Sequence, residues 1–284
     1  MNSICRISAI YNEEDIIQQN LKWYSERGIP NVILDNGSTD GTYNICKELL
    51  GNEIYSLKKV PFEEHDRELS LKELSKLTRD LPFDYLLLAD ADEFYESPVR
   101  DEDLKVSLEN EIKKGYNIVR FHNIEFWMTE KDDLSESNPL KRIRHYSFFD
   151  SNRYKLFPNN SSINFWSKFG HVPIFSKNLK FNESPKIHIS RHYKFRSLAQ
   201  GYAKINRIKP PVRRKDVSFH YIMFKESPEN FIIPSDLLTE YFEDSNWDLE
   251  RKFDGKRMNK TELMNYLGIK IEKELEKWFT SRSK

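Results

Sequence analysis

Cysteine, net charge and long apolar runs are all scarce in this sequence. The 284 residues include two cysteines, Cys5 and Cys46, in segments that we expect to be buried, and with no disulfide framework indicated a reduced, cytoplasmic chain is the default expectation. The 45 Lys and Arg residues balance the 45 Asp and Glu residues, which gives no global attraction to nucleic acid or anionic lipid. No stretch approaches the roughly 18 apolar residues of a spanning helix, and the start carries no signal-peptide pattern. We therefore expect no nucleic-acid partner and no transmembrane segment, and leave peripheral docking on a membrane open.

The first 115 residues alternate between apolar runs and helical spacing. Strands are predicted at residues 7–11, 32–34, 53–57 and 85–89, with helices between them, the first of which is expected to start at Asn12 as its N-cap. Strands that alternate with helices predict an α/β fold with a doubly wound, mostly parallel sheet and helices on both faces. In such folds ligands bind beyond the carboxyl ends of the strands.

The rest of the chain has a different pattern. Residues 116–208 contain strands of mixed polarity and are typical of an α+β arrangement. From about residue 217 onward the spacing is helical, with a charged outer face that is typical of solvated helices. The best boundary is the basic, proline-containing stretch "KPPVRRK" at residues 209–215.

Polar clusters follow three of the predicted strands, at residues 11–13, 35–42 and 90–93. Because the carboxyl ends of parallel strands share one edge of a sheet, we expect these clusters to converge. The second, "DNGSTDGT", combines glycines that permit a sharp turn with hydroxyls and amides that can hold an anion or a ribose at a helix start. Its alternative is a simple turn with a helix cap.

The third cluster, "LLLADADEFY", leads from a buried strand into an acidic tip. Asp90 and Asp92 are one residue apart, so in an extended chain their carboxylates point the same way, and like charges this close are costly without a cation between them. Oxygen ligands of this kind suit Mg²⁺ or Mn²⁺, whose remaining positions go to water and phosphate. The alternative is a solvated acidic loop.

The motifs "ISAIYNEE", "VILDNGSTDGT" and "LLLADADEFY", in this order, resemble the family 2 nucleotide-sugar glycosyltransferases of the D-x-D-E subgroup over residues 4 to 205. The resemblance implies a GT-A-type, Rossmann-like fold, Mn²⁺ or Mg²⁺, a donor of the UDP- or GDP-sugar class, and inverting transfer to a hydroxyl of a glycan or glycolipid. By resemblance, Asp90 faces the ribose and the metal, Asp92 ligates the metal, and the nucleoside is held by Ala9, Tyr11, Glu13, Asp35 and Asn36.

The segment "KIHISRHYKFRS" resembles the part of related enzymes that presents a late histidine to the metal. His192 is preferred over His188 as this ligand, because the residues after it match that segment and imidazole suits Mn²⁺. Arg191 and Arg196 are candidates to pair with the diphosphate, since a planar guanidinium matches phosphate geometry. Each is equally well interpreted as a surface cation.

The catalytic base is the least defined part of the predicted site. An inverting transfer needs a group that takes the proton of the acceptor hydroxyl. His171 and Glu183 are the two candidates, and their alternatives are a core histidine and an exposed loop glutamate.

Three units follow from this interpretation: residues 1–115 as the nucleotide-sugar-binding half, 116–208 as the acceptor and metal-completing half of the same domain, and 209–284 as a helical extension. Two other functions stay open. A nucleotidyltransferase also combines a doubly wound sheet with paired carboxylates, but it would carry a basic glycine-rich loop where this chain has "NEE". A catalytically idle sugar- or nucleotide-binding module would have no need of two mutually repelling carboxylates.

Overall fold

The computed structural model describes residues 3–61, 67–160, 163–165, 173–175, 180–206 and 231–242, with the backbone alone at 148–152 and at 175. Its strands are β1 Ile4–Ile10, β2 Asn31–Asp35, β3 Ile54–Lys59, β4 Tyr85–Leu88, β5 Glu93–Glu96, β6 Val119–Trp127, β7 His145–Pro158, β8 Ile163–Asn164, β9 Ile174–Phe175, β10 His188–His192 and β11 Thr239–Glu240. Its helices are α1 Ile17–Ser25, α2 Thr42–Glu48, α3 Arg67–Thr78, α4 Leu104–Lys113, α5 Pro139–Arg142 and α6 Leu198–Asn206.

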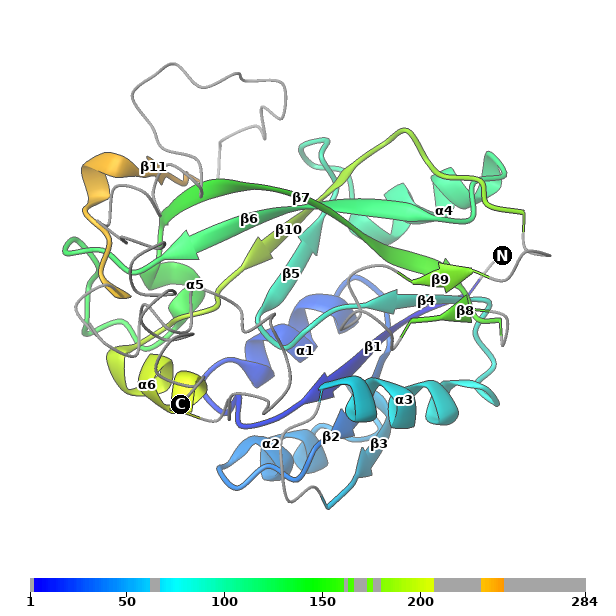
Figure 1. Ribbon diagram of the computed structural model, residues 1–284, viewed down its shortest axis with the longest axis horizontal. Coiled ribbons are helices and arrows are strands. Elements are labelled where there is room, and N and C mark those ends of the chain that lie inside the picture. Colours follow the sequence, from blue (N-terminus) through cyan, green and yellow to red (C-terminus); the bar gives the residue numbers. More distant parts are fainter. Residues whose placement is uncertain are drawn as a thin grey trace, which may run out of the picture.

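One central sheet organises the molecule, in the order β3-β2-β1-β4-β7-β6-β10-β5, with β11 paired to β7 (Figure 1). The strands β3, β2, β1 and β4 are parallel to one another. Within the described sheet, β7 and β5 run against the other strands. The sheet therefore continues from the parallel half into a mixed half, as expected for the α/β and then α+β patterns of the sequence.

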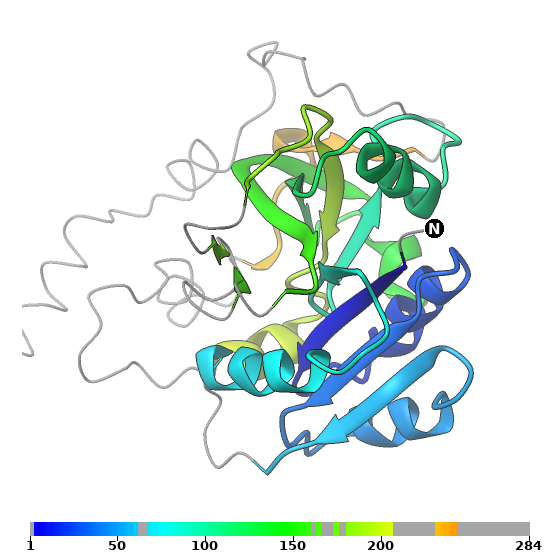
Figure 2. The same cartoon turned by 90° about the vertical axis from the view of Figure 1, so that its right-hand side faces the viewer.

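Both faces of the parallel half are covered because its strands are apolar at successive positions. Val32 and Leu34 pack with Leu71 and Leu74 of α3 on one face. Ile33 points to the opposite face, where it packs with residues of α1 and α2. Figure 2 shows α3 on one side of these strands and α1 and α2 on the other. The predicted α/β fold class is confirmed: a mostly parallel, Rossmann-like sheet with helices on both faces.

Both cysteines lie in this half. Cys5 on β1 and Cys46 on α2 are free and buried, and their burial agrees with the prediction from the sequence. No helix in the described ranges is long and apolar enough to cross a membrane.

Most of the predicted helical extension at 209–284 lies outside the described residues. The described part, 231–242, forms a short 3₁₀ turn at Ser235–Leu237 and then β11, not the helix that its spacing predicts. Phe231, Ile233 and Leu238 are buried in a core cluster with β6 and β10. Pairing with β7 and burial of these three side chains therefore override the local helical pattern.

Candidate functional site

The three polar clusters meet at the carboxyl edge of the parallel strands, as predicted. The backbone amide of Glu13 donates to Thr42 Oγ1 at 2.7 Å, and Asn12 Oδ1 accepts the amide of Thr39 at 2.8 Å, which ties the segment after β1 to the segment after β2. Arg196 contacts Glu13 and lies 3.9 Å from Asp92, which ties in the segment after β4. The sheet edge thus gathers residues that are far apart in the chain.

The residue expected to cap the first helix has a different role. Asn12 has a φ of 52°, a left-handed conformation that asparagine tolerates, and α1 begins five residues later at Ile17. The non-helical segment between β1 and α1 brings Glu13 and Asp15 over the strand ends. Tyr11 lies half-buried in the same segment, and Ala9 lies on β1 beside Leu34.

Asp35 ends β2 as a fully buried carboxylate. Its Oδ1 accepts the amides of Gly37 at 3.2 Å and Ser38 at 3.0 Å, and Gly37 has a φ of 77° that permits the turn. Its Oδ2 is buried and has no hydrogen-bond partner in the described part of the chain. Asn36 beside it is also buried. A buried carboxylate oxygen without a partner is costly unless a ligand supplies a donor.

Asp90 is held by a residue that the sequence did not single out. Arg67, the first residue of α3, donates from Nη2 to both oxygens of Asp90, at 2.6 and 2.8 Å. The chain therefore supplies its own cation at the first position of the acidic tip. The backbone carbonyl of Asp90 accepts a hydrogen bond of 3.1 Å from the buried Arg6, which helps to fix the backbone of the acidic tip.

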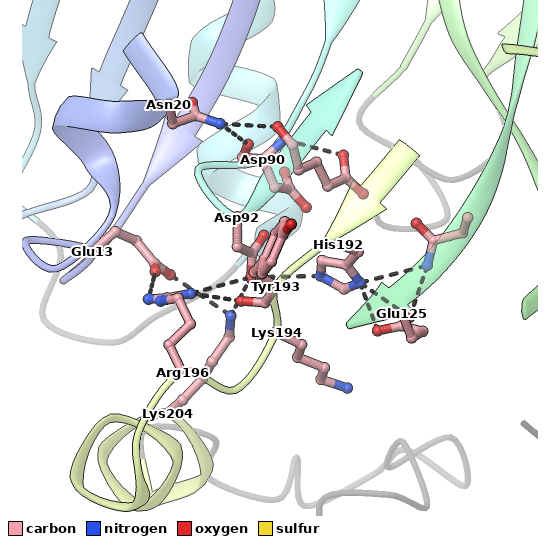
Figure 3. A network of polar contacts seen from close by, with 12 residues as sticks. Glu13, Asn20, Asp90, Asp92, Glu125, His192, Tyr193, Lys194, Arg196 and Lys204 are labelled. Atoms are coloured by element: carbon pink, nitrogen blue, oxygen red, sulfur yellow. Dashed lines mark hydrogen bonds and ion pairs between the residues drawn. The ribbon is translucent and has the colours of Figure 1, made fainter. Parts of the chain in front are cut away.

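Asp92 lies at the centre of the site (Figure 3). Its Oδ2 is 2.5 Å from Lys204 Nζ and 3.5 Å from His192 Nε2. Burial alone would raise the pKa of Asp92, but Lys204 and His192 hold that pKa well below its usual range. The carboxylate is thus ionised, and its charge is balanced by side chains from α6 and β10.

His192 is clamped between two carboxylates. Glu125 lies 3.0 Å from its Nδ1, and Asn123 donates to Glu125 at 2.7 Å. Burial lowers the pKa of His192, but Glu125 and Asp92 outweigh burial and raise it to about 9. Glu125 was missed from the sequence because its position opposite His192 depends on the β6–β10 register. In Figure 3, His192 points from β10 toward Asp92 with Glu125 behind it.

Arg196 is fully buried among acidic groups. It donates to Glu13 at 2.5 Å and, through two nitrogens, to Asp15 at 2.8 Å each. Its Nη1 donates to the carbonyl of Tyr193 at 3.0 Å. This predicted donor-binding residue therefore lies at the site, with its guanidinium already hydrogen-bonded to two carboxylates.

The predicted metal ligands fit an ion only in part. Among the described residues, no three His, Cys, Asp or Glu side chains form a group that could hold a metal as they stand. Asp92 and His192 do fit as a pair, because Glu125 takes Nδ1 and leaves Nε2 directed at Asp92, in the manner of a carboxylate–histidine–metal arrangement. Asp90 does not join them, since Arg67 binds both of its oxygens.

Two predicted site residues lie elsewhere. Arg191 points to the face of the sheet opposite His192, because neighbouring strand residues alternate; it pairs with Glu96 at 2.9 Å and lies 4.7 Å from the centre of the Trp23 ring. Glu183 pairs with Arg120 and accepts from Tyr154 at the start of β6, whereas the site lies at its end. The structure corrects both assignments.

Of the other two histidines considered in the sequence, one lies in the described part of the chain. His188 is buried and lies 2.9 Å from Ser107 Oγ, as expected for a core histidine. His171 lies outside the described residues, so its role as a base stays a prediction.

No protein-family model matches this chain, and no curated protein matches it. Among solved structures, it is similar to S. aureus TarS residues 1–349 in complex with UDP-GlcNAc, with 10% identity, a TM-score of 0.37, and coverage of 82% of this chain and 74% of that chain. A protein from Desulfovibrio desulfuricans described as a nucleotide-diphospho-sugar transferase has 9% identity and a TM-score of 0.34, with coverage of 81% and 98%. A longer TarS structure has 11% identity and a TM-score of 0.36. The match covers 81% of this chain but only 43% of the TarS chain, so this chain spans less than half of that protein's length.

Proposed function

We propose that the protein is a glycosyltransferase that moves a sugar from a nucleoside diphosphate sugar to a hydroxyl of a glycan or glycolipid. The observation that carries this proposal is the arrangement around Asp92. A buried carboxylate at the end of a parallel strand is surrounded by His192, Arg196 and Lys204 from the second half of the chain. Such a mixture of charges suits a diphosphate and its counter-ion.

The nucleoside is assigned to the edge formed by β1 and β2. The partnerless Oδ2 of Asp35 supports this assignment, because a base N–H is a donor that would satisfy it. Asn36, Tyr11 and Glu13 border the same edge, on the segments that follow β2 and β1. The proposed donor is a UDP-sugar or a GDP-sugar, and the proposed acceptor group is a hydroxyl of a glycan or glycolipid.

The transfer is a displacement at the anomeric carbon of the sugar. The acceptor oxygen forms a bond to that carbon, the bond from carbon to the β-phosphate oxygen breaks, and its electron pair leaves with the nucleoside diphosphate. The hydroxyl proton passes to a base, for which His171 is the proposed residue, and inversion follows from direct displacement. Among the described residues, the positive charges around Asp92 would help to balance the charge of the leaving group.

Mn²⁺ or Mg²⁺ is proposed as the cofactor, held by Asp92 and His192. A bound divalent ion supplies Lewis-acid stabilisation of the charge on the departing diphosphate. Glu125 orients the His192 ring with Nε2 toward Asp92, and Nε2 would give up its proton on binding the ion; phosphate and water would supply the other ligands.

A donor panel tests the proposal directly. UDP- and GDP-sugars are incubated with the protein in Mn²⁺ and then in a chelator, and nucleoside diphosphate release is measured. Release that needs Mn²⁺ and is lost in Asp92→Asn supports the transferase. Pyrophosphate released from a nucleoside triphosphate would indicate nucleotidyl transfer instead, and tight donor binding without turnover would indicate a binding module; either result would overturn the proposal.

A further inference from the structure

We propose that Lys204 is the cation that binds the β-phosphate of the donor and remains with it in the leaving nucleoside diphosphate. This inference rests on the proposed transferase function. Lys204 lies in the last turn of α6, and its Nζ is 2.5 Å from Asp92 Oδ2 and 3.8 Å from Glu13 Oε1. Lys204 therefore contacts both the acidic tip after β4 and the segment after β1. The diphosphate would lie between these two segments.

Comparison with Arg196 shows why Lys204 is the residue suited to this task. The side chain of Arg196 is 0% exposed, and its hydrogen bonds to Glu13, Asp15 and the Tyr193 carbonyl orient the whole guanidinium. The side chain of Lys204 is 15% exposed, so it is less enclosed than that of Arg196. An ammonium on a flexible four-carbon stem can also turn from a carboxylate to a nearby phosphate, which a fixed guanidinium cannot.

The charges that face Lys204 come from three directions. Asp92 lies after β4, Glu13 and Asp15 lie before α1, and the cations His192 and Arg196 come from β10 and the residues that follow it. Three carboxylates here would repel a diphosphate unless mobile positive charge accompanied it. Lys204 meets that need when its ammonium moves from Asp92 to the phosphate, which leaves Asp92 free for a metal ion.

The packing of α6 against the core fixes the direction in which Lys204 points. Gly201, three residues earlier, is buried against Phe231, and a Cβ at this position would be 2.9 Å from the phenyl ring. Ile205 is buried in the same core cluster. The helix is thus pressed onto the core by one face, and Lys204 reaches from it toward Asp92 and Glu13, as Figure 3 shows.

The proposal predicts a loss of affinity that depends on the number of phosphates. Binding of UDP, UMP, GDP and GMP is measured by isothermal titration calorimetry, once with Mn²⁺ and once with a chelator. For the base that the wild-type protein binds, Lys204→Met is expected to weaken diphosphate binding by about tenfold or more, which corresponds to about 1.4 kcal/mol. Monophosphate binding is expected to change by less than about threefold, because a monophosphate lacks the second phosphate to which Lys204 would bind.

Lys186→Met is the matched control. Lys186 is 22% exposed and lies 2.5 Å from Glu102, at the other end of the sheet, so this variant also removes a short, partly buried ion pair. Lys186→Met is expected to bind the diphosphate and the monophosphate with the same affinities as the wild type. Thermal denaturation checks that each variant is folded, and Lys204→Gln, which can still hydrogen-bond to Asp92, replaces Lys204→Met if that variant does not fold.

The outcomes separate the two proposals. A wild type that binds none of these nucleoside diphosphates would overturn the transferase function and this inference with it. A wild type that binds a diphosphate while the folded Lys204 variants bind it equally well would overturn the inference alone. A loss that is the same for monophosphate and diphosphate would also overturn it, because Lys204 would then support the site without contacting the second phosphate.

Discussion

Glu93 turns its carboxylate to Lys155, whose Nζ lies 3.0 Å from Oε2. The acidic tip is therefore not a cluster of three unpaired charges. Arg67 binds Asp90, Lys204 binds Asp92, and Lys155 with Arg153 binds Glu93. Each carboxylate has a cation from a different part of the chain, so the charge repulsion that the sequence implies is resolved before any ligand arrives.

Replacement of Glu93 by glutamine is expected to destabilise the fold. Lys155 is 1% exposed and would lose its buried counter-ion, and breaking a buried pair in this way costs about 3–5 kcal/mol. The free energy of unfolding, measured by urea denaturation, is the readout. Glu93→Gln combined with Lys155→Met is expected to recover part of the loss, and an unchanged stability in Glu93→Gln would contradict this account.

Asp35→Asn is expected to weaken nucleotide binding with little effect on stability. The asparagine keeps an oxygen for the amides of Gly37 and Ser38, but it places an NH₂ group where the partnerless Oδ2 lies. Loss of an acceptor for a base N–H costs about 1–3 kcal/mol, or roughly 5- to 150-fold in affinity. Calorimetry with the nucleoside diphosphate that binds the wild type measures it. Unchanged affinity would remove Asp35 from the base site.

Lys204→Met is expected to strengthen Mn²⁺ binding in the absence of nucleotide. In the wild type, the ammonium of Lys204 lies against the oxygen of Asp92 that would ligate the ion, so the two cations compete. Electron paramagnetic resonance of free Mn²⁺ is expected to show about tenfold tighter binding in the variant. The added Asp92→Asn change should abolish the gain; if the double variant binds Mn²⁺ equally well, the ion binds elsewhere.

Glu183→Gln is expected to leave turnover within about twofold of the wild type. Glu183 lies at the start of β6 with Arg120 and Tyr154, whereas a base must lie within hydrogen-bond reach of the proton it removes. Nucleoside diphosphate release at saturating donor and acceptor is the measurement. A loss of about a hundredfold or more in a folded variant would make Glu183 a candidate base again.

The stability of the fold is expected to decrease on mild acidification because of His188. Burial and the nearby Lys186 lower the pKa of His188 from 6.5 to about 4. Below pH 6.5 the unfolded chain therefore takes up a proton that the folded chain does not, and stability falls until about pH 4. The loss is on the order of 3 kcal/mol. Urea denaturation at several pH values should show a weaker decrease in His188→Gln, and equal decreases would contradict the assignment.

The parallel half of the fold could be predicted because each of its strands is encoded by a short, continuous stretch of the sequence. The run Val32–Leu34 is apolar at successive positions, as a strand covered on both faces requires, and the polar residues that follow each strand converge by topology alone. The acidic tip can be located in the same way, since Leu86–Leu88 places it at a strand end.

The remainder of the site depends on contacts that the sequence does not encode locally. The alternation of Arg191 and His192 is visible in the sequence, but which of them faces the site depends on how β10 is oriented between β6 and β5. Arg67 and Lys204 lie 23 and 112 residues from the carboxylates they bind, and no spacing rule connects them. The helical spacing of residues 231–242 is overridden because Leu238 is buried in the core and Thr239–Glu240 pairs with β7.

The position of β10 has a consequence for synthesis of the protein. This strand lies between β6 and β5, and the backbone amide of Tyr193, directly after it, donates to the carbonyl of Asp92 at 2.9 Å. A nascent chain that has emerged only as far as β6 has the acidic tip but lacks the strand and helix that bring in His192, Arg196 and Lys204. The charge-balanced arrangement can therefore assemble on the ribosome only after α6 has left the exit tunnel.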